Sequence, residues 1–208
     1  PVGAHEVNVT GTLNLLEFAM SQARDHGCSV MFFYPSSIAV YGTPIHLGDR
    51  PVSERECSTP RTMYGSNKLY CEHLGRYYAS YYKQLDTEVH ANLVDFRSIR
   101  FPGLISALTM PSGGTSDYAS EMIHAAAKGE AYTCFVRPDT RIPFMAMPDA
   151  IDAILALTNR EGTSLSQHVY NVSAFNPSAA EIHELVAKAY PAVHVAFEPD
   201  TQRQAIVD

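Results

Sequence analysis

Apolar residues recur along this chain with two periods, one typical of helices and one typical of strands. Between about residues 6 and 24 the apolar positions stand three or four apart, which predicts a helix with one buried face. These positions are Val9, Leu13, Leu16 and Met20. The short apolar run at residues 30–34 then indicates a buried strand. A helix followed directly by a buried strand favours an α/β fold.

Later segments continue this alternation. Residues 42–62 are rich in Gly, Pro, Ser and Thr and are predicted to form a long loop over the carboxyl edge of the sheet. A second long helix is expected at about residues 62–84. A strand at residues 93–99 should end at Phe101, because Pro102 has no amide hydrogen to donate. Shorter elements follow, with helices expected at about 117–128, 148–159 and 178–189 and strands at 131–136, 142–147, 168–172 and 193–197.

Composition and charge narrow the classes of partner. The chain has 208 residues, enough to bury a substantial core, and a formal net charge of −7 from 15 basic and 22 acidic residues. Because the net charge is negative and the sequence has no basic run, it indicates no positive surface that would bind a nucleic-acid backbone or an anionic membrane. No apolar run approaches the ~20 residues of a membrane-spanning helix. We therefore expect a soluble protein with a small-molecule partner, and neither nucleic acid nor membrane as a partner.

The cysteine and histidine patterns argue against two further kinds of site. The four cysteines are far apart without a Cys-x-x-Cys motif, and the nine histidines include no pair spaced by four on a predicted helix. Neither a disulfide framework nor a metal site is indicated. This usage fits an intracellular, reducing compartment, and it does not distinguish the cytoplasm from the mitochondrial matrix.

The candidate chemistry centres on Tyr64 and Lys68. Four residues are about one helical turn, so the phenol and the ammonium share one face and can share one ligand. A phenol ionises near pH ~10 and a nearby cation lowers that pKa, so we expect Lys68 to make Tyr64 a better base. Ser36 and Ser37 would bring two hydroxyls to the carboxyl end of a parallel sheet, where α/β proteins bind ligands. The alternative is a chance pair on an exposed helix, with Ser37 as a turn hydroxyl.

Three segments occur in an order that one enzyme family shows. They run from Asn8 to Glu17, from Ser36 to Gly42 and from Tyr64 to Lys68. Together they resemble the extended short-chain dehydrogenase/reductases, also called the NAD-dependent epimerase/dehydratase family. Within that family, residues 97–106, 113–119 and 132–140 are similar to the short-chain type of L-threonine 3-dehydrogenase. The resemblance covers most of the chain.

For the fold, the resemblance implies a Rossmann-like, doubly wound, mostly parallel α/β sheet with a small interleaved α/β substrate lobe. Residues 1–103 would be the C-terminal part of the dinucleotide-binding domain. Residues 104–208 would be mostly the substrate-binding lobe, with some segments returning to the main sheet. None of the twelve glycines forms Gly-x-Gly-x-x-Gly, so the pyrophosphate turn is missing. We therefore expect a fragment clipped at both ends, without the first strands, with little or no NAD affinity and no activity of its own.

For the function, the resemblance implies NAD-dependent oxidation of the secondary alcohol of L-threonine to 2-amino-3-oxobutanoate. Tyr64 would take the hydroxyl proton, and Ser37 would hydrogen-bond the substrate oxygen. The implied catalytic residues are Asn8, Ser37, Tyr64 and Lys68; those next to NAD are Ser36, Tyr64, Lys68, Phe101 and Leu104; those next to the amino acid are Ser37, Tyr64, Thr115 and Ser116. Without the surrounding family motifs, Asn8 would be interpreted as a helix cap.

The segment at residues 111–117 suggests a second contact with the substrate. A helix start there would offer free amides and nearby hydroxyls, which suit a carboxylate. Asp117 is expected to cap this helix, and Asp149 to cap a later one. Arg100 and Arg137 could also bind a carboxylate, but charged residues at strand ends are usually solvated or paired locally.

The helix at residues 62–84 carries more tyrosines than one core can take. Either each ring is buried with its hydroxyl in water, or the helix forms a dimer seam with the helix at residues 6–24. The second account follows the resembling family and implies a homodimer through these two helices.

Two competing functions remain open. A nucleotide-sugar epimerase or dehydratase would share Asn8, Ser37, Tyr64 and Lys68 and would differ in the substrate lobe. The lack of an evident basic cluster in residues 101–160 and the match at residues 113–119 favour a small substrate over a large diphosphate. The other reading is a non-catalytic remnant that keeps the dimer helices, and the missing glycine turn is its only support.

Overall fold

The computed structural model describes residues 2–42, 50–86 and 93–207. They form two compact units, one made of Pro1–Phe101 and Ala153–Val172 and the other of Pro102–Asp152 and Ser173–Asp208. Each unit has its own strands and its own hydrophobic core. The chain therefore enters the second unit directly after a strand of the first, and it returns to the first unit once.

Three parallel strands form the sheet of the first unit. They are β1 (Val30–Ser37), β2 (Val94–Phe101) and β6 (Val169–Asn171), in the order β1-β2-β6. β1 and β2 pair along their whole length, from Val30 opposite Val94 to Ser37 opposite Phe101. The two strands therefore end side by side. The predicted α/β fold with a parallel sheet is confirmed.

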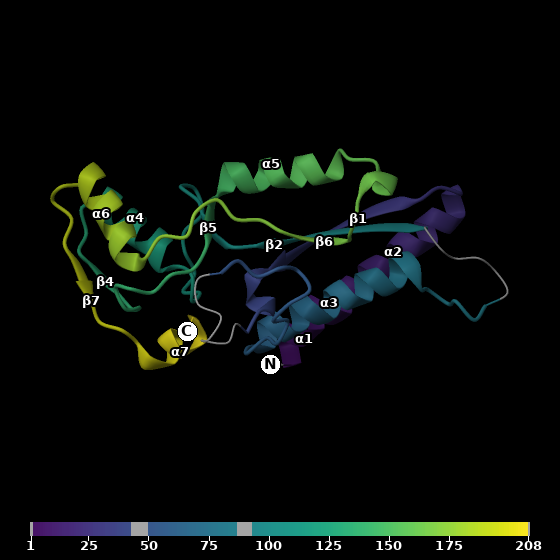
Figure 1. Cartoon of the computed structure of the whole chain (residues 1–208), viewed down its shortest axis with the longest axis horizontal. Helices are drawn as coiled ribbons and strands as arrows, with labels where there is room; N and C mark the ends of the chain where they lie inside the picture. Colours follow the sequence, from purple (N-terminus) through teal and green to yellow (C-terminus); the bar gives the residue numbers. More distant parts are fainter. Residues whose placement is uncertain (1, 43–49, 87–92, 208) are drawn as a thin grey trace. The chain divides into compact units, whose positions relative to one another are not determined.

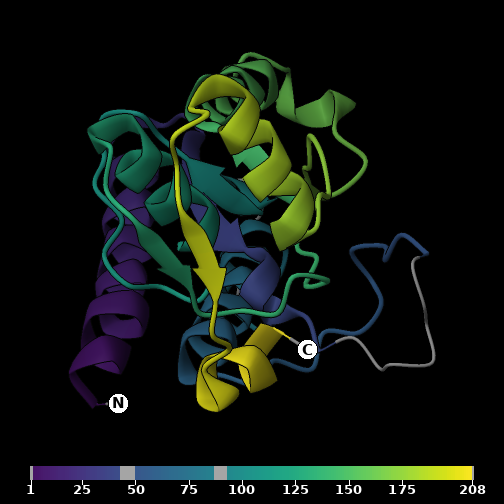
Figure 2. The same cartoon turned by 90° about the vertical axis from the view of Figure 1, so that its left-hand side faces the viewer.

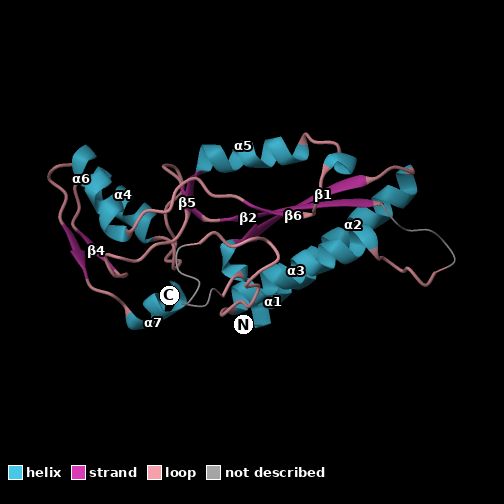
Figure 3. Ribbon diagram, viewed as in Figure 1, coloured by secondary structure: helices cyan, strands magenta, loops and turns pink. Residues whose placement is uncertain are grey.

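Helices lie on both faces of this sheet. α1 (Val2–His5), a π-helical segment η1 (Glu6–Thr10) and α2 (Gly11–His26) follow one another directly, and Gly27 ends α2 with a left-handed φ of 64°. α3 (Met63–Ser80) runs beside α2 (Figure 1). These helices cover one face, and the part of α5 (Met147–Thr158) that belongs to this unit lies on the other (Figure 3).

α3 packs closely against the sheet because two of its glycines face other groups at short range. A Cβ on Gly65 would lie 2.0 Å from the carbonyl oxygen of Ala39, in the short 3-10 turn η2 (Ile38–Val40) that follows β1. A Cβ on Gly75 would lie 2.1 Å from the Phe96 ring of β2. Thr62 caps the helix by accepting a hydrogen bond from the Gly65 amide at 3.0 Å. The first turn of α3 is thereby held at the carboxyl end of β1.

The tyrosines of α3 and the turn after it divide into two groups. Tyr78 and Tyr82 are buried in the core, and both donate their hydroxyls to the carboxylate of Glu17 on α2. The other four are exposed on the surface, namely Tyr64, Tyr70, Tyr77 and Tyr81. The prediction that these tyrosines cannot all face one core is therefore confirmed.

The second unit contains two pairs of parallel strands. β3 (Gly103–Ile105) pairs with β5 (Phe144–Ala146), and β4 (Tyr132–Cys134) pairs with β7 (Val195–Phe197), as Figure 2 shows for the second pair. Its core is built around Tyr118, Met122 and Phe144. The helices of this unit are α4 (Tyr118–Lys128), α6 (Ala179–Ala189), α7 (Thr201–Val207) and the first half of α5. Ser178 and Glu181 form a reciprocal cap at the start of α6, where the sequence predicts a helix start.

Several element boundaries differ from those predicted. The first helical run begins at Val2, and the second long helix ends at Ser80. Asp149 is the third residue of α5 instead of its cap, because the helix starts at Met147 directly after β5 and tolerates Pro148 in its first turn. α7 has no counterpart among the predicted elements, since its short and mostly polar sequence shows no apolar period. Among the helices of the described residues, none combines the length and apolar character that crossing a bilayer requires.

Candidate active site

Tyr64 and Lys68 lie together in the first two turns of α3, over the end of β1. The Lys68 Nζ is 5.6 Å from the centroid of the Tyr64 ring and 4.9 Å from that of Tyr34. It donates a hydrogen bond to the backbone carbonyl of Pro35 at 2.6 Å. The Tyr64 side chain is about half exposed, at 47% of the residue surface. The pair therefore shares one face of the helix, at the place where parallel sheets bind ligands.

The protonation of this pair differs from the simple expectation. Burial raises the pKa of Tyr64, and the interaction with the Ser37 side chain acts in the opposite direction. Burial lowers the pKa of Lys68. Both shifts have one cause, because burial disfavours the charged form of either group. The expected lowering of the Tyr64 pKa by Lys68 is not found here, since Nζ lies over the ring and is held by Pro35.

Ser37 is the last residue of β1. Its side chain both caps the turn that follows and interacts with Tyr64. Its hydroxyl oxygen accepts a hydrogen bond from the amide of Ala39 at 3.1 Å, which caps η2. The same side chain interacts with Tyr64. The structure therefore brings Ser37, Tyr64 and Lys68 together, as the site prediction requires.

Asn8 approaches α3 through its backbone. Its side-chain amide donates to the carbonyl of Ala4 at 2.8 Å, back along its own helix. Its carbonyl oxygen accepts from the thiol of Cys71 at 3.3 Å and from the Thr12 hydroxyl at 2.6 Å. Asn8 lies inside the π-helical segment, a distortion often found at functional sites, and is therefore no helix cap. Its side chain does not join Tyr64 in this structure.

Ser36 points its hydroxyl into a buried polar network instead of the candidate site. The hydroxyl donates to Glu72 of α3 at 2.6 Å, and Glu72 forms an ion pair with Arg100 of β2 at 2.6 Å. Arg100 also donates to the hydroxyl of Tyr41 at 2.7 Å. The side chains of Arg100 and Glu72 are 1% and 0% exposed. The Ser36 hydroxyl therefore donates within this network, and its predicted contact with the cofactor stays a prediction.

This network is the main feature that the sequence did not reveal. Glu72 stands one turn beyond Lys68, which is a detectable signal, but its partner Arg100 is 28 residues away and is identified only by the strand register. Arg137 meets the expectation that strand-end arginines are paired locally, because it pairs with Asp139 at 3.1 Å. Arg100 does not, because its partner Glu72 is distant in the sequence.

The remaining predicted residues lie in different parts of the chain. Phe101 ends β2 directly opposite Ser37 and is 8% exposed. Leu104 is a half-buried residue of β3 in the second unit. Thr115 and Ser116 precede α4 and are half-buried, and within the described chain their hydroxyls have no hydrogen-bond partner.

Asp117 changes the expectation for the segment before α4. Its carboxylate accepts hydrogen bonds from the amides of Ser112, Gly113 and Gly114 at 3.0, 3.0 and 2.8 Å, and it forms no capping bond to α4. Asp117 therefore holds the N-cap position of α4, as predicted, but makes no capping hydrogen bond. Its carboxylate instead occupies the amides of the preceding loop, at Ser112, Gly113 and Gly114. In the described ranges, no cluster of three or more His, Cys, Asp or Glu side chains is arranged to hold a metal ion.

A parallel α/β sheet with a Tyr-x-x-x-Lys helix at its carboxyl edge places this chain among the Rossmann-like nucleotide-binding folds. The model of the NAD dependent epimerase/dehydratase family matches residues 1–173. The chain belongs to this family.

Known relatives narrow the similarity further. The chain is 37% identical over 205 residues to mitochondrial L-threonine 3-dehydrogenase of Bos taurus. This alignment covers 99% of the chain and 50% of the relative. The holo form of a GalE-like L-threonine dehydrogenase from Cupriavidus necator is 36% identical with a TM-score of 0.83, covering 100% of this chain and 62% of that one. L-threonine dehydrogenase from Phytophthora infestans is 38% identical with a TM-score of 0.79. That match covers 100% of this chain and 61% of the other. The chain thus spans half the length of the bovine relative.

Proposed function

We propose that this chain is part of an NAD-dependent oxidoreductase that oxidises the secondary alcohol of L-threonine to 2-amino-3-oxobutanoate. One observation carries the proposal. Tyr64, Lys68 and Ser37 are gathered at the carboxyl end of β1, in a chain 37% identical over 99% of its length to an L-threonine 3-dehydrogenase. Membership of the NAD dependent epimerase/dehydratase family supports the cofactor.

The hydrogen-bonding groups at this edge suit a nicotinamide nucleotide. Lys68 offers an ammonium, and Tyr64 and Ser37 offer hydroxyls, at the end of the sheet where α/β folds bind nucleotides. The glycine turn that cradles a pyrophosphate is not among the residues of this chain. The chain therefore supplies contacts for the nicotinamide and ribose end.

In the proposed reaction, the Tyr64 oxygen takes the proton from the substrate hydroxyl. The Ser37 hydroxyl donates to the same substrate oxygen and keeps it beside the base. Bound NAD would supply the acceptor for the hydride that leaves the neighbouring carbon. Lys68, whose ammonium donates to the Pro35 carbonyl in this structure, would hold the ribose of the cofactor. Because burial raises the pKa of Tyr64 and the base acts in its deprotonated form, turnover should increase with pH on the alkaline side.

The first test is Tyr64→Phe in the complete polypeptide, assayed with NAD and L-threonine. The substitution removes the titrating oxygen and keeps most of the ring packing, so turnover should fall by at least 100-fold, in line with the loss of a general base, which is worth about 10²–10⁴. Tyr70→Phe is the matched control, because Tyr70 is on the same helix and is 52% exposed, against 47% for Tyr64. This control should keep full turnover.

Other outcomes of that assay would overturn the assignment. An active Tyr64→Phe enzyme would remove the proposed base. Turnover of nucleotide sugars in place of L-threonine would assign the chain to the epimerases or dehydratases of the same family. Absence of any turnover by a folded complete polypeptide that binds NAD would indicate a non-catalytic protein.

We also infer that the protein is a homodimer through α2 and α3. Tyr70, Tyr77 and Tyr81 are exposed at spacings of seven and four, so they line one face of α3 and the turn after it. On the neighbouring helical run, Leu15 and Phe18 are 57% and 61% exposed. Such an aromatic and apolar surface on two adjacent helices suits an interface between copies.

Light scattering coupled to gel filtration measures this directly. The wild-type mass should be that of two chains, and Phe18→Glu should shift it to one chain, because a charge would be buried at the seam. Glu130→Gln, at an exposed position of the second unit, is the control and should leave the dimer intact. A monomeric wild-type protein at micromolar concentration would refute the dimer.

A further inference from the structure

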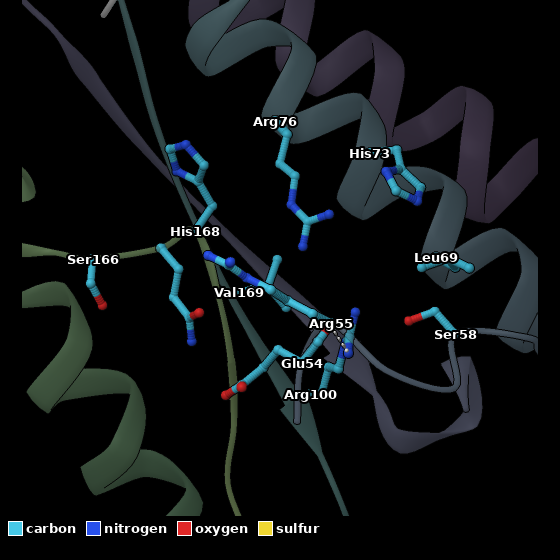
Figure 4. A pocket seen from close by; sticks show the side chains of 11 residues that line it. Glu54, Arg55, Ser58, Leu69, His73, Arg76, Arg100, Ser166, His168 and Val169 are labelled. Carbon is cyan, nitrogen blue, oxygen red and sulfur yellow. Dashed lines mark hydrogen bonds between the residues drawn. The ribbon is translucent and has the colours of Figure 1, made fainter. Parts of the chain in front are cut away.

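A pocket of about 510 Å³ lies in the first unit, and neither Tyr64 nor Lys68 is among the side chains that line it (Figure 4). It is lined by α3, by the loop at residues 54–58 and by the segment that enters β6. His73 and Arg76 are the polar residues that α3 contributes. At about 100° per residue, His73 lies about 140° around the helix from Lys68. The pocket is therefore separate from the candidate active site.

Positive charge dominates this pocket. Figure 4 shows Arg76 extending from α3 and Arg55 extending from the loop into the same hollow, near the ring of His168. Within the residues that the structure describes, neither Arg55 nor Arg76 has a hydrogen bond or an ion pair. Arg100 lies behind them, and its charge is already balanced by Glu72. Among the residues that the structure describes, these two guanidinium groups therefore have no counter-ion.

One acidic side chain shares the pocket, and it is already engaged. The carboxylate of Glu54 accepts a hydrogen bond from the amide of Asn171 at 2.9 Å. With Arg55 and Arg76 positive and Glu54 negative, the pocket keeps a net positive charge. The whole chain carries −7. A positive pocket in an acidic protein attracts small anions selectively, because the surrounding surface repels them.

His168 gives the pocket a fixed wall. One of its ring nitrogens lies 3.0 Å from the carbonyl of Phe96 and the other 3.4 Å from the hydroxyl of Ser80. The ring is thus held between β2 and α3. Ser58 and Gln167 add neutral polar groups to the lining. Fixed polar groups around a hollow of this size are typical of small-molecule sites.

We propose that this pocket binds a small organic oxyanion, with Arg55 and Arg76 as its main ligands. Guanidinium groups present paired N–H donors that match phosphate and carboxylate oxygens. Binding would neutralise two like charges that otherwise repel each other inside one hollow. The site does not depend on the proposed dehydrogenase activity, and its occupancy is measured by binding alone.

Titration calorimetry of the purified complete polypeptide in low salt tests this, with pyrophosphate and citrate as probes. We expect saturable binding of at least one probe, which weakens as salt is added. Arg55→Gln/Arg76→Gln should reduce the affinity at least tenfold. The variant should fold normally, because neither side chain has a partner in the described structure. The tighter of the two probes identifies the ligand as a phosphate or a carboxylate.

Arg160→Gln is the matched control. Arg160 is an exposed arginine of the same unit that does not line the pocket, so its loss removes one charge without touching the site. It should leave the affinity within twofold of the wild type. An equal loss of affinity in this control would show that only the diffuse charge matters and would overturn the proposal. Failure of both probes to bind at millimolar concentration would overturn it as well.

Discussion

Successive turns of α3 carry ionisable side chains in opposite conditions. Against β2, Glu72 is fully buried and accepts two hydrogen bonds from Arg100, at 2.6 and 2.8 Å. At the end of β1, one and two turns earlier, Tyr64 is half exposed, and Lys68 is held by a single backbone carbonyl. The buried pair has its charges fully satisfied. The Tyr64–Lys68 turn keeps a titrating phenol and an ammonium accessible to a ligand.

The difference shows how one helix combines stability with chemistry. A buried ion pair tolerates no change of partner, because each charge depends on the other for the hydrogen bonds that water no longer supplies. A half-exposed pair can exchange a backbone contact for a substrate or cofactor contact at little cost. Adjacent residues of β1 follow the same division, since Ser36 joins the buried network and Ser37 lies by Tyr64.

The largest effect is expected from removing one partner of the buried pair. Glu72→Ala leaves the guanidinium of Arg100 buried without its carboxylate, so the free energy of unfolding should fall by about 3–5 kcal/mol. Urea unfolding followed by circular dichroism measures this loss. Ser36 would also lose the acceptor of its hydroxyl, which adds to the penalty.

Two controls isolate the cause. The double variant Glu72→Met/Arg100→Met replaces both charges with apolar side chains and should recover most of the lost stability. Glu56→Gln weakens an exposed pair with Arg50, whose side chains are 40% and 48% exposed, and should change the unfolding midpoint far less. A Glu72→Ala variant as stable as the wild type would show that the network contributes little to the fold.

A smaller loss of stability is expected from a substitution where α3 packs most closely against the sheet. A Cβ on Gly75 would lie 2.1 Å from the Phe96 ring, so Gly75→Ala should force the helix outward and reduce the free energy of unfolding by about 1–3 kcal/mol. Gly11→Ala in α2 is the matched control, because the nearest atom would be 3.9 Å away. That control should stabilise the protein by up to about 1 kcal/mol through helix propensity. Equal effects in the two urea unfolding curves would contradict the close approach.

The sequence predicted the features that depend on short spacings. The apolar period at Val9, Leu16 and Met20 identified a helix whose inner face is buried in the structure. The spacing of Tyr64 and Lys68 predicted a shared face for the same reason, since four residues are about one turn. The parallel pairing of β1 and β2 also followed from the order of helices and strands.

Features that depend on distant partners could not be predicted in the same way. The pairing of Glu72 with Arg100 needs the helix to be placed on a particular strand register, which no local pattern contains. The thiol of Cys71 reaches the carbonyl of Asn8 across 63 positions for the same reason. Asp117 shows that a local contact can be missed as well, because its carboxylate binds amides of the preceding loop and makes no capping bond to α4. The sequence identified the Tyr64–Lys68 turn of α3 and left the buried pair one turn further along unseen.

The smallest of these effects concerns the cap at the start of α3, next to Tyr64. Thr62 accepts from the Gly65 amide at 3.0 Å, two residues before Tyr64, so Thr62→Ala should reduce the free energy of unfolding by about 1 kcal/mol and fray the first turn. Hydrogen exchange at the Gly65 amide should accelerate more than exchange in the middle of the helix. Thr62→Ser keeps the hydroxyl and should restore the protection. If the cap holds Tyr64 in place, Thr62→Ala in the complete polypeptide should lose more turnover than its loss of stability explains. Unchanged hydrogen exchange at the Gly65 amide would show that packing against Ala39, and not the cap, fixes this turn.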